Sequence, residues 1–115
     1  MVIKKWTIYW VNLDPVVGSE QGGTRPVLLV SDDAVNVLNQ VSILPITSLK
    51  DPNREIYPNE AFLPKAVSGL DKDSIVLAHQ IRTLDKQRLQ SVAGPIQEAE
   101  TKAAIEAAMR VQLGL

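Results

Sequence analysis

Apolar residues along the chain gather in short runs of strand length, and only one stretch has the spacing of a helix. Residues 6–13 alternate between two faces, one with Ile8 and Trp10 and the other with Tyr9 and Val11, which predicts a strand. Pro45 inside one of the later runs indicates an edge strand or a bulge. Further strands are expected at residues 26–31, 41–46, 56–63, 74–78 and 92–96.

Residues 97–113 form the one clear helical pattern, rich in residues of high helix propensity. The predicted apolar stripe follows the spacing i, i+3, i+4, i+7 and consists of Ile105, Ala108, Met109 and Gln112. Short helical turns are expected at 32–37 and 84–90, and polar turns at 50–55 and 69–73. Five to seven short strands without βαβ alternation predict a mostly β fold: a small antiparallel barrel-like sheet with short helices and a C-terminal helix. The length of 115 residues predicts a single domain, residues 1–115.

Composition removes several classes of function. The chain has no cysteine and only one histidine, His79, so a thiol nucleophile, a two-histidine site and a multi-histidine metal centre are excluded within one subunit. We expect no metal and no cofactor. Net charge is −1, which gives no global attraction to nucleic acid or acidic lipid. Without a signal peptide or a membrane-spanning run, the default expectation is a soluble cytoplasmic protein that does not act at a membrane.

A glycine-rich loop leads into the strand at 26–31, within the stretch GSEQGGTRPVLLVS of residues 18–31. Gly18, Gly22 and Gly23 allow positive φ or a close approach of the backbone to a ligand, so they are candidate hinges. Arg25 follows, a cation at the junction of a polar loop and a rigid strand, which suits anion binding. The same pattern also fits an ordinary hairpin loop with a solvated arginine.

Three strand ends carry groups able to bind phosphate. Arg25 begins one strand, Thr47 ends another, and Gln80 with Arg82 follows a third. An arginine can bind a phosphate with two parallel hydrogen bonds, and a threonine hydroxyl can donate to the same group or orient an attacking 2′-OH. If the three ends converge, they form a site able to stabilise a phosphorane without metal. The alternative is that these are solvated residues at the rim of a barrel.

Three separated motifs in register, GSEQGGTRPVLLVS, ILPITS and DKDSIVLAHQIRTLDKQRL, resemble the MazF/PemK/Kid family of toxin endoribonucleases. The resemblance spans nearly the whole chain. It implies the SH3-like barrel shared by MazF, Kid and the CcdB gyrase poison, and a homodimer that cleaves single-stranded RNA at short sequences without metal. It also implies a MazE-like antitoxin that neutralises the toxin, and binding to operator DNA only through that antitoxin.

Carried over by motif, the resemblance assigns catalysis to Arg25 and Thr47. The residues that it implies in substrate binding are Glu20, Gln21, Ser48, Gln80 and Arg82. The reaction is attack of the 2′-OH on phosphorus, giving a 2′,3′-cyclic phosphate and a 5′-OH. One departure is Trp6-Thr7, which stands where many members have Gly-Asp before the first strand.

Two other functions fit the same fold. One is a gyrase-poisoning toxin, because fold alone does not decide function. The other is a degenerate toxin that retains binding to antitoxin and operator DNA. Arg25 and Thr47 together favour RNA cleavage, because a gyrase binder needs neither residue.

Overall fold

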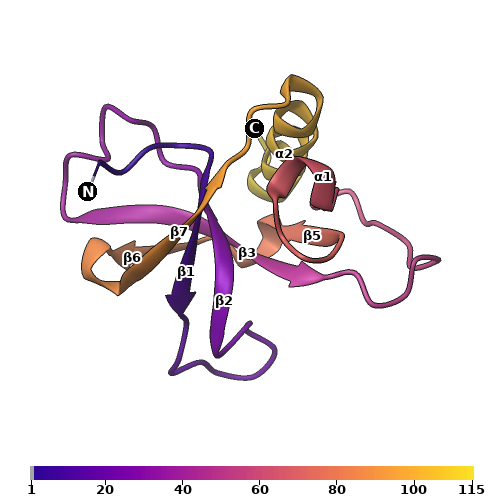
Figure 1. The fold of residues 1–115 in the computed structure, drawn as a ribbon, viewed down its shortest axis with the longest axis horizontal. Helices are drawn as coiled ribbons and strands as arrows, with labels where there is room; N and C mark the ends of the chain where they lie inside the picture. Colours follow the sequence, from indigo (N-terminus) through magenta and orange to yellow (C-terminus); the bar gives the residue numbers. More distant parts are fainter. Residues whose placement is uncertain (1) are drawn as a thin grey trace.

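The structure, a computed structural model, describes residues 2–115 as a curved antiparallel sheet with one long helix against it (Figure 1). The strands are β1 (Thr7–Asn12), β2 (Thr24–Leu29), β3 (Gln40–Ser48), β4 (Glu60–Leu63), β5 (Ser74–Leu77), β6 (Arg82–Asp85) and β7 (Leu89–Pro95). The helices are α1 (Lys65–Ser68) and α2 (Ala99–Leu113), and two single 3₁₀ turns, η1 (Ala78–Gln80) and η2 (Lys86–Arg88), join strands.

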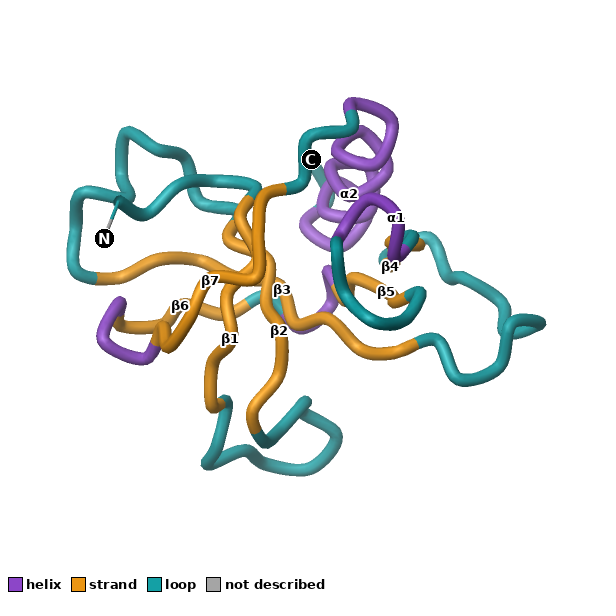
Figure 2. Tube along the Cα trace, viewed as in Figure 1, coloured by secondary structure: helices purple, strands orange, loops and turns teal. Residues whose placement is uncertain are grey.

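The strand order is β4-β5-β3-β2-β1-β7, with β6 also paired to β3, and all pairs are antiparallel. The predicted fold class is therefore confirmed. Three long loops extend from the sheet, between β1 and β2, β2 and β3, and β3 and β4 (Figure 2).

Strand β3 is the centre of the sheet and has two successive partners along one edge. Residues 40–43 pair with β6 and residues 46–48 pair with β5. Pro45 lies in the gap between these two partners, where the missing N–H removes no bond to β6 or β5. The expectation that Pro45 marks an edge strand is therefore wrong, because β3 is flanked on both sides; the proline is tolerated at the break between partners.

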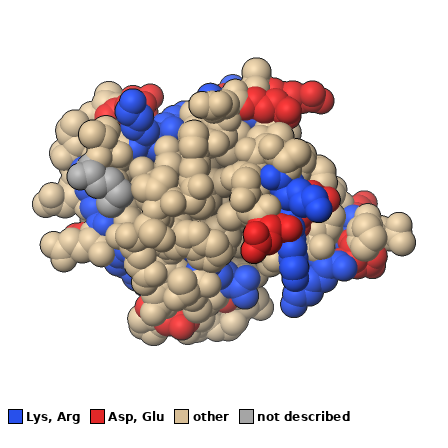
Figure 3. All heavy atoms as spheres, in the orientation of Figure 1, with Lys and Arg blue, Asp and Glu red and all other residues tan. Residues whose placement is uncertain are grey.

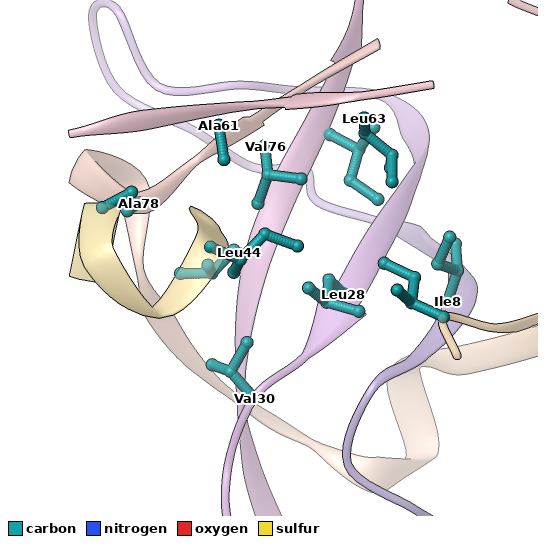
Figure 4. Close-up of a cluster of buried hydrophobic side chains, with 12 residues drawn as sticks. Ile8, Leu28, Val30, Leu44, Ala61, Leu63, Val76 and Ala78 are labelled. Atoms are coloured by element: carbon teal, nitrogen blue, oxygen red, sulfur yellow. The ribbon is translucent and has the colours of Figure 1, made fainter. Parts of the chain in front are cut away.

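Alternation along β1, β2 and β3 builds one apolar core on each face of the sheet. On the first face, Ile8, Leu28 and Leu44 meet side chains from β4 and β5, as Figure 4 shows. On the second face, Tyr9, Val27 and other side chains form a separate core closed by β6 and β7. The predicted alternation of residues 6–13 is confirmed, since both faces of β1 are used.

Helix α2 packs on β4 and η1 and closes the first core. Ile105 and Ala108 are buried as predicted, and Met109 is half-buried against the core. Gln112, predicted on the same stripe, is exposed and does not pack in the core. Its Oε1 accepts a hydrogen bond from Asn59 Nδ2 at 3.2 Å. Thr101, one turn before Ile105, is buried as well, so the buried stripe of the helix consists of Thr101, Ile105 and Ala108.

The two short helical turns predicted from the sequence are confirmed in part. Within residues 84–90 the single turn η2 begins after Asp85, whose carboxylate accepts from Gln87 N at 2.9 Å. On either side of this turn the chain is extended, because Leu84 pairs with β3 and Leu89 with β1. At residues 32–37 a turn forms but no regular helix, and Asp32 begins it: its carbonyl oxygen accepts from Asn36 N at 3.0 Å and its carboxylate from Ala34 N at 2.9 Å.

Trp6 stands where many family members have glycine, and its backbone has the conformation that glycine would adopt most easily. Its φ is +70°, in the left-handed region that favours glycine. The strained residue is held by two backbone hydrogen bonds, Trp6 N to Leu29 O at 2.8 Å and Ile96 N to Trp6 O at 2.7 Å. Its ring packs against the first core, with the ammonium groups of Lys5 and Lys102 at 5.3 and 5.6 Å. Packing and cation–π contacts offset the backbone strain.

Candidate functional site

The candidate site lies where β2 and β3 separate. Their ladder ends at the pair Val27↔Pro45, and residues 46–48 of β3 pair with β5 instead. Continuing the same register by two residues brings Arg25 opposite Thr47, on the face of the sheet shared with Val27. Because the ladder has ended before this position, Arg25 and Thr47 are not paired with each other.

Arg25 is half-buried and oriented by its own loop. Its Nε donates to the carbonyl oxygen of Gly22 at 2.7 Å. Its two terminal Nη groups make no hydrogen bond with any other residue of the described range 2–115, so the fork is available for two bonds to a phosphate. Thr47 is also half-buried, and its hydroxyl is likewise without a partner among residues 2–115.

A hollow of about 480 Å³, the central hollow, opens beside this pair. Its apolar wall includes Trp10 and Ile46. Its polar rim includes Arg25, Ser48 and Lys72. Ser48 lies opposite Ser74 in the β3–β5 ladder, so its position is fixed by strand pairing.

The loop between β1 and β2 is fixed at its base. Leu13 N donates to Gly23 O at 2.9 Å, and Gly23 N donates to Asp14 Oδ1 at 3.0 Å. Gly23 has a φ of +73°, in the left-handed region that favours glycine. A Cβ on Gly22 would lie 2.8 Å from Asp14 Oδ1, so a side chain there would displace the carboxylate that accepts from Gly23 N. Mobility of this loop, with the glycines as hinges, stays a prediction; its base offers few degrees of freedom.

A second hollow of about 390 Å³, the loop hollow, brings together four of the predicted substrate-binding residues. Its lining includes Glu20, Gln21, Gln80 and Arg82. Gln80 Oε1 accepts a hydrogen bond from Gln21 N at 2.7 Å, which holds the loop against η1. Arg82 Nη1 donates to Leu13 O at 3.2 Å. Glu20 turns back to accept a hydrogen bond from Val17 N.

Gln21 carries an unsatisfied polar atom. Its side-chain oxygen is buried and has no hydrogen-bond partner. A buried carbonyl oxygen without a donor is costly, and a ligand that supplies one removes that cost. Among the described residues, Gln21 Oε1 is therefore an acceptor without a donor beside the loop hollow.

The predicted residues therefore divide between two neighbouring hollows. Arg25 and Ser48 line the central hollow, while Glu20, Gln21, Gln80 and Arg82 line the loop hollow. Thr47 lies on β3 between them, next to Ser48 and two residues after Pro45, which lines the loop hollow.

Sequence reasoning missed two lining residues. His79, used in the sequence analysis only to exclude two-histidine sites, lines the loop hollow; its place directly before Gln80 was the signal. Trp10 lines the central hollow and is only half-buried, although it lies in the middle of β1.

Charged side chains do not form one basic surface. On the face in Figure 3, acidic and basic side chains alternate near the edges around a largely uncharged centre. Within residues 2–115 no three His, Asp or Glu side chains cluster so as to hold a metal ion. Over the same range, the helices are too short and too polar to cross a bilayer.

The loop between β3 and β4 is organised by an ion pair. Arg54 donates from Nη1 and Nη2 to the two carboxylate oxygens of Glu60, at 2.9 and 2.8 Å. Tyr57 N donates to Glu60 Oε1 at 3.1 Å. The side chain of Glu60 is 4% exposed and that of Arg54 36%. Hydrogen bonding from Arg54 lowers the pKa of Glu60 below its ordinary value, more than burial raises it.

Replacing Glu60 with glutamine is expected to cost about 1–2 kcal/mol of stability at pH 7, between the values for exposed and buried ion pairs. Because the folded-state pKa of Glu60 is lowered, its contribution is full above the unfolded-state pKa, near 4.3, and is lost as the pH falls through the folded-state value. Urea denaturation of wild type and Glu60→Gln at pH 7 and at pH 3 tests this. The difference in free energy of unfolding between wild type and Glu60→Gln is expected to be smaller at pH 3 than at pH 7. A larger difference at pH 3 would contradict the ion pair between Arg54 and Glu60.

The fold is a small antiparallel sheet with a C-terminal helix, and the candidate site lies beside the point where two of its strands separate. Residues 4–113 match the model of the PemK-like, MazF-like toxin of type II toxin–antitoxin systems. Two curated relatives are endoribonucleases by name. The chain is 38% identical over 89 residues to Endoribonuclease EndoA of Bacillus subtilis, covering 77% of this chain and 76% of that protein. It is 36% identical over 115 residues to Endoribonuclease MazF of Staphylococcus epidermidis, covering 99% and 93%.

Solved structures of MazF from Deinococcus radiodurans have the same fold. One superimposes with a TM-score of 0.80 at 29% identity, covering 100% of this chain and 99% of that one. Another, a MazE–MazF structure, gives a TM-score of 0.72 at 26% identity with the same coverage. The chain belongs to the PemK-like, MazF-like family of type II toxins, and the resemblance read from its three motifs is confirmed.

Proposed function

We propose that the protein is the toxin of a type II toxin–antitoxin system and acts as a sequence-selective endoribonuclease on single-stranded mRNA, without metal. The observation that carries the proposal is the fork of Arg25, whose Nη groups make no hydrogen bond within residues 2–115 and which lies on β2 just beyond the last pair of the β2–β3 ladder. Membership of the toxin family and two curated relatives named endoribonucleases support it.

Arg25 neutralises charge on the phosphate. The RNA 2′-OH attacks phosphorus, its proton is lost, and a pentacoordinate phosphorane with added negative charge forms. The P–O5′ bond then breaks, leaving a 2′,3′-cyclic phosphate, and the 5′-oxygen takes up a proton to become a 5′-OH. A guanidinium group is a poor base and a good electrostatic partner, so the part of Arg25 is to stabilise the phosphorane and donate hydrogen bonds.

The Nε bond to Gly22 gives Arg25 a fixed orientation. A donor that is held in place before the substrate binds does not have to reorganise during the reaction, which is the basis of electrostatic preorganisation. Thr47 donates from its hydroxyl to the phosphate or to the attacking 2′-oxygen. Its backbone is held on the central strand, where Thr47 lies opposite Ile75 of β5.

The loop hollow binds the bases next to the cleaved bond and discriminates between them. Gln21 offers its unsatisfied oxygen, and Gln80 offers an amide that now holds the loop. Arg82, which also borders the hollow, supplies positive charge for the backbone. RNA entering this hollow exchanges the Gln80–Gln21 bond for bonds to a base.

The same proposal includes a homodimer and a MazE-like antitoxin. One subunit measures 39 × 31 × 31 Å, so a dimer gives an extended RNA a longer path. A MazE–MazF structure of a family member supports the antitoxin as partner. Operator DNA is bound through the antitoxin alone, and the mRNA substrate makes the cytoplasm the place of action.

Incubating purified protein with a long mixed-sequence RNA in EDTA tests this function. Discrete cleavage sites are expected, with 5′-OH ends that accept phosphate from a kinase before adapter ligation. Protein inactivated by heat serves as the control for chemical hydrolysis. Absence of cleavage, or cleavage restored only by added Mg²⁺, would refute the proposal; absence of cleavage together with gyrase binding would favour a gyrase poison.

A further inference from the structure

A third hollow, the outer hollow, adjoins the loop hollow. It encloses about 620 Å³, and Tyr57, Asn59 and Glu60 are among its lining residues. His79 lines both the outer hollow and the loop hollow. Because one side chain belongs to both walls, an extended molecule in the loop hollow can continue past His79 into the outer hollow.

The far wall of the outer hollow is already ordered. This wall is the end of the loop that leaves β3 and returns to β4 (Figure 2). The Arg54–Glu60 ion pair and the bond from Tyr57 N to Glu60 fix its conformation. Asn59 anchors it to the body, since Ala78 N donates to Asn59 O at 3.2 Å and Asn59 Nδ2 bonds to Gln112. Because this wall is already held in place, its residues lose little conformational entropy when a ligand binds.

The chemistry of this wall fits a flat, uncharged partner. Tyr57 is 52% exposed although its backbone is held. The guanidinium carbon of Arg54 lies 5.8 Å from the centre of the Tyr57 ring, and its charge is neutralised by Glu60. A phosphate would need an unpaired cation here, whereas a nucleobase needs an aromatic face.

We propose that Tyr57 and His79 form a stacking subsite for one unpaired nucleobase of the RNA, outside the nucleotides at the cleaved bond. The inference rests on the proposed function and extends it to a specificity-determining position. The subsite contributes to binding and to sequence preference and takes no part in the chemical step. The loop hollow and the outer hollow together then read a longer stretch of RNA than the loop hollow alone.

The test compares Tyr57→Ala, Tyr57→Phe and wild type. Cleavage sites in mixed-sequence RNA are mapped by sequencing, and KM and kcat are measured on a preferred oligonucleotide and on versions shortened from either end. Phe62→Ala is the matched control, because Phe62 is an aromatic residue 40% exposed on β4 and outside the lining of the hollow.

Tyr57→Ala is expected to raise KM by about 10-fold, the effect of losing one stacked base, with kcat unchanged, and to lose the sequence preference at one flanking position. Tyr57→Phe retains the ring and behaves as wild type. On an oligonucleotide too short to reach the subsite, wild type and Tyr57→Ala have the same KM. Equal KM and equal preference for Tyr57→Ala on long RNA would overturn the subsite while cleavage by wild type upholds the proposed function; a wild type that cleaves no RNA refutes both.

Discussion

Replacing Arg25 with alanine is expected to slow RNA cleavage by at least about 100-fold, the usual effect of removing one preorganised donor to a transition state. The loss falls on kcat, because the fork of Arg25 meets its strongest partner only when the phosphorane forms. Single-turnover cleavage of a preferred oligonucleotide measures it. A rate within a factor of three of wild type would remove Arg25 from the catalytic role.

Two further variants separate the parts played by Arg25. Arg25→Lys keeps a charge but lacks the planar fork, and it removes the Nε bond to Gly22, so an intermediate rate is expected. Arg110→Ala is the matched control, since Arg110 is an exposed arginine near the end of α2, paired at 3.8 Å only with Glu106. It is expected to cleave at the wild-type rate with wild-type stability.

Replacing Leu44 with alanine is expected to lower the free energy of unfolding by about 2–5 kcal/mol, through lost transfer energy and a residual cavity. Leu44 is fully buried on β3, opposite Leu28 in the ladder and in contact with the first core (Figure 4). Urea denaturation at pH 7 measures the change. Val35→Ala is the control: Val35 is 47% exposed, and a change within about 0.5 kcal/mol is expected. Equal stability losses in the two variants would contradict the assigned core.

Alternating apolar runs were enough to predict most of the sheet. β1, β3 and β5 each carry a pattern that local side chains impose, and α2 has both helix propensity and an apolar stripe. β6 (Arg82–Asp85) was missed because no local pattern distinguishes it from the turn that follows, and only pairing with β3 makes it extended. The edge prediction for Pro45 failed for the same reason: a change of partner along one strand is a property of the whole sheet.

Most predicted site residues line one of two hollows, but the division into hollows and the places of His79 and Trp10 were not predictable from the sequence. Motif order identifies Arg25, Thr47 and Gln80 without coordinates. The bond from Gln21 N to Gln80, 59 positions away, depends on tertiary packing. Catalytic roles for Arg25 and Thr47 stay predictions until their variants are measured.

The position of β3 has a consequence for how the protein opens. This strand is bonded to β2, β5 and β6, whereas β4 and β7 terminate the sheet and have one neighbour each. Partial unfolding starts at terminal strands and exposed loops, so Thr47 stays in place through local fluctuations that release the ends of the sheet. Arg25 differs from Thr47 in this respect, because its orientation depends on the carbonyl oxygen of Gly22 in the loop between β1 and β2, so opening of that loop would release Arg25 while Thr47 stayed on β3.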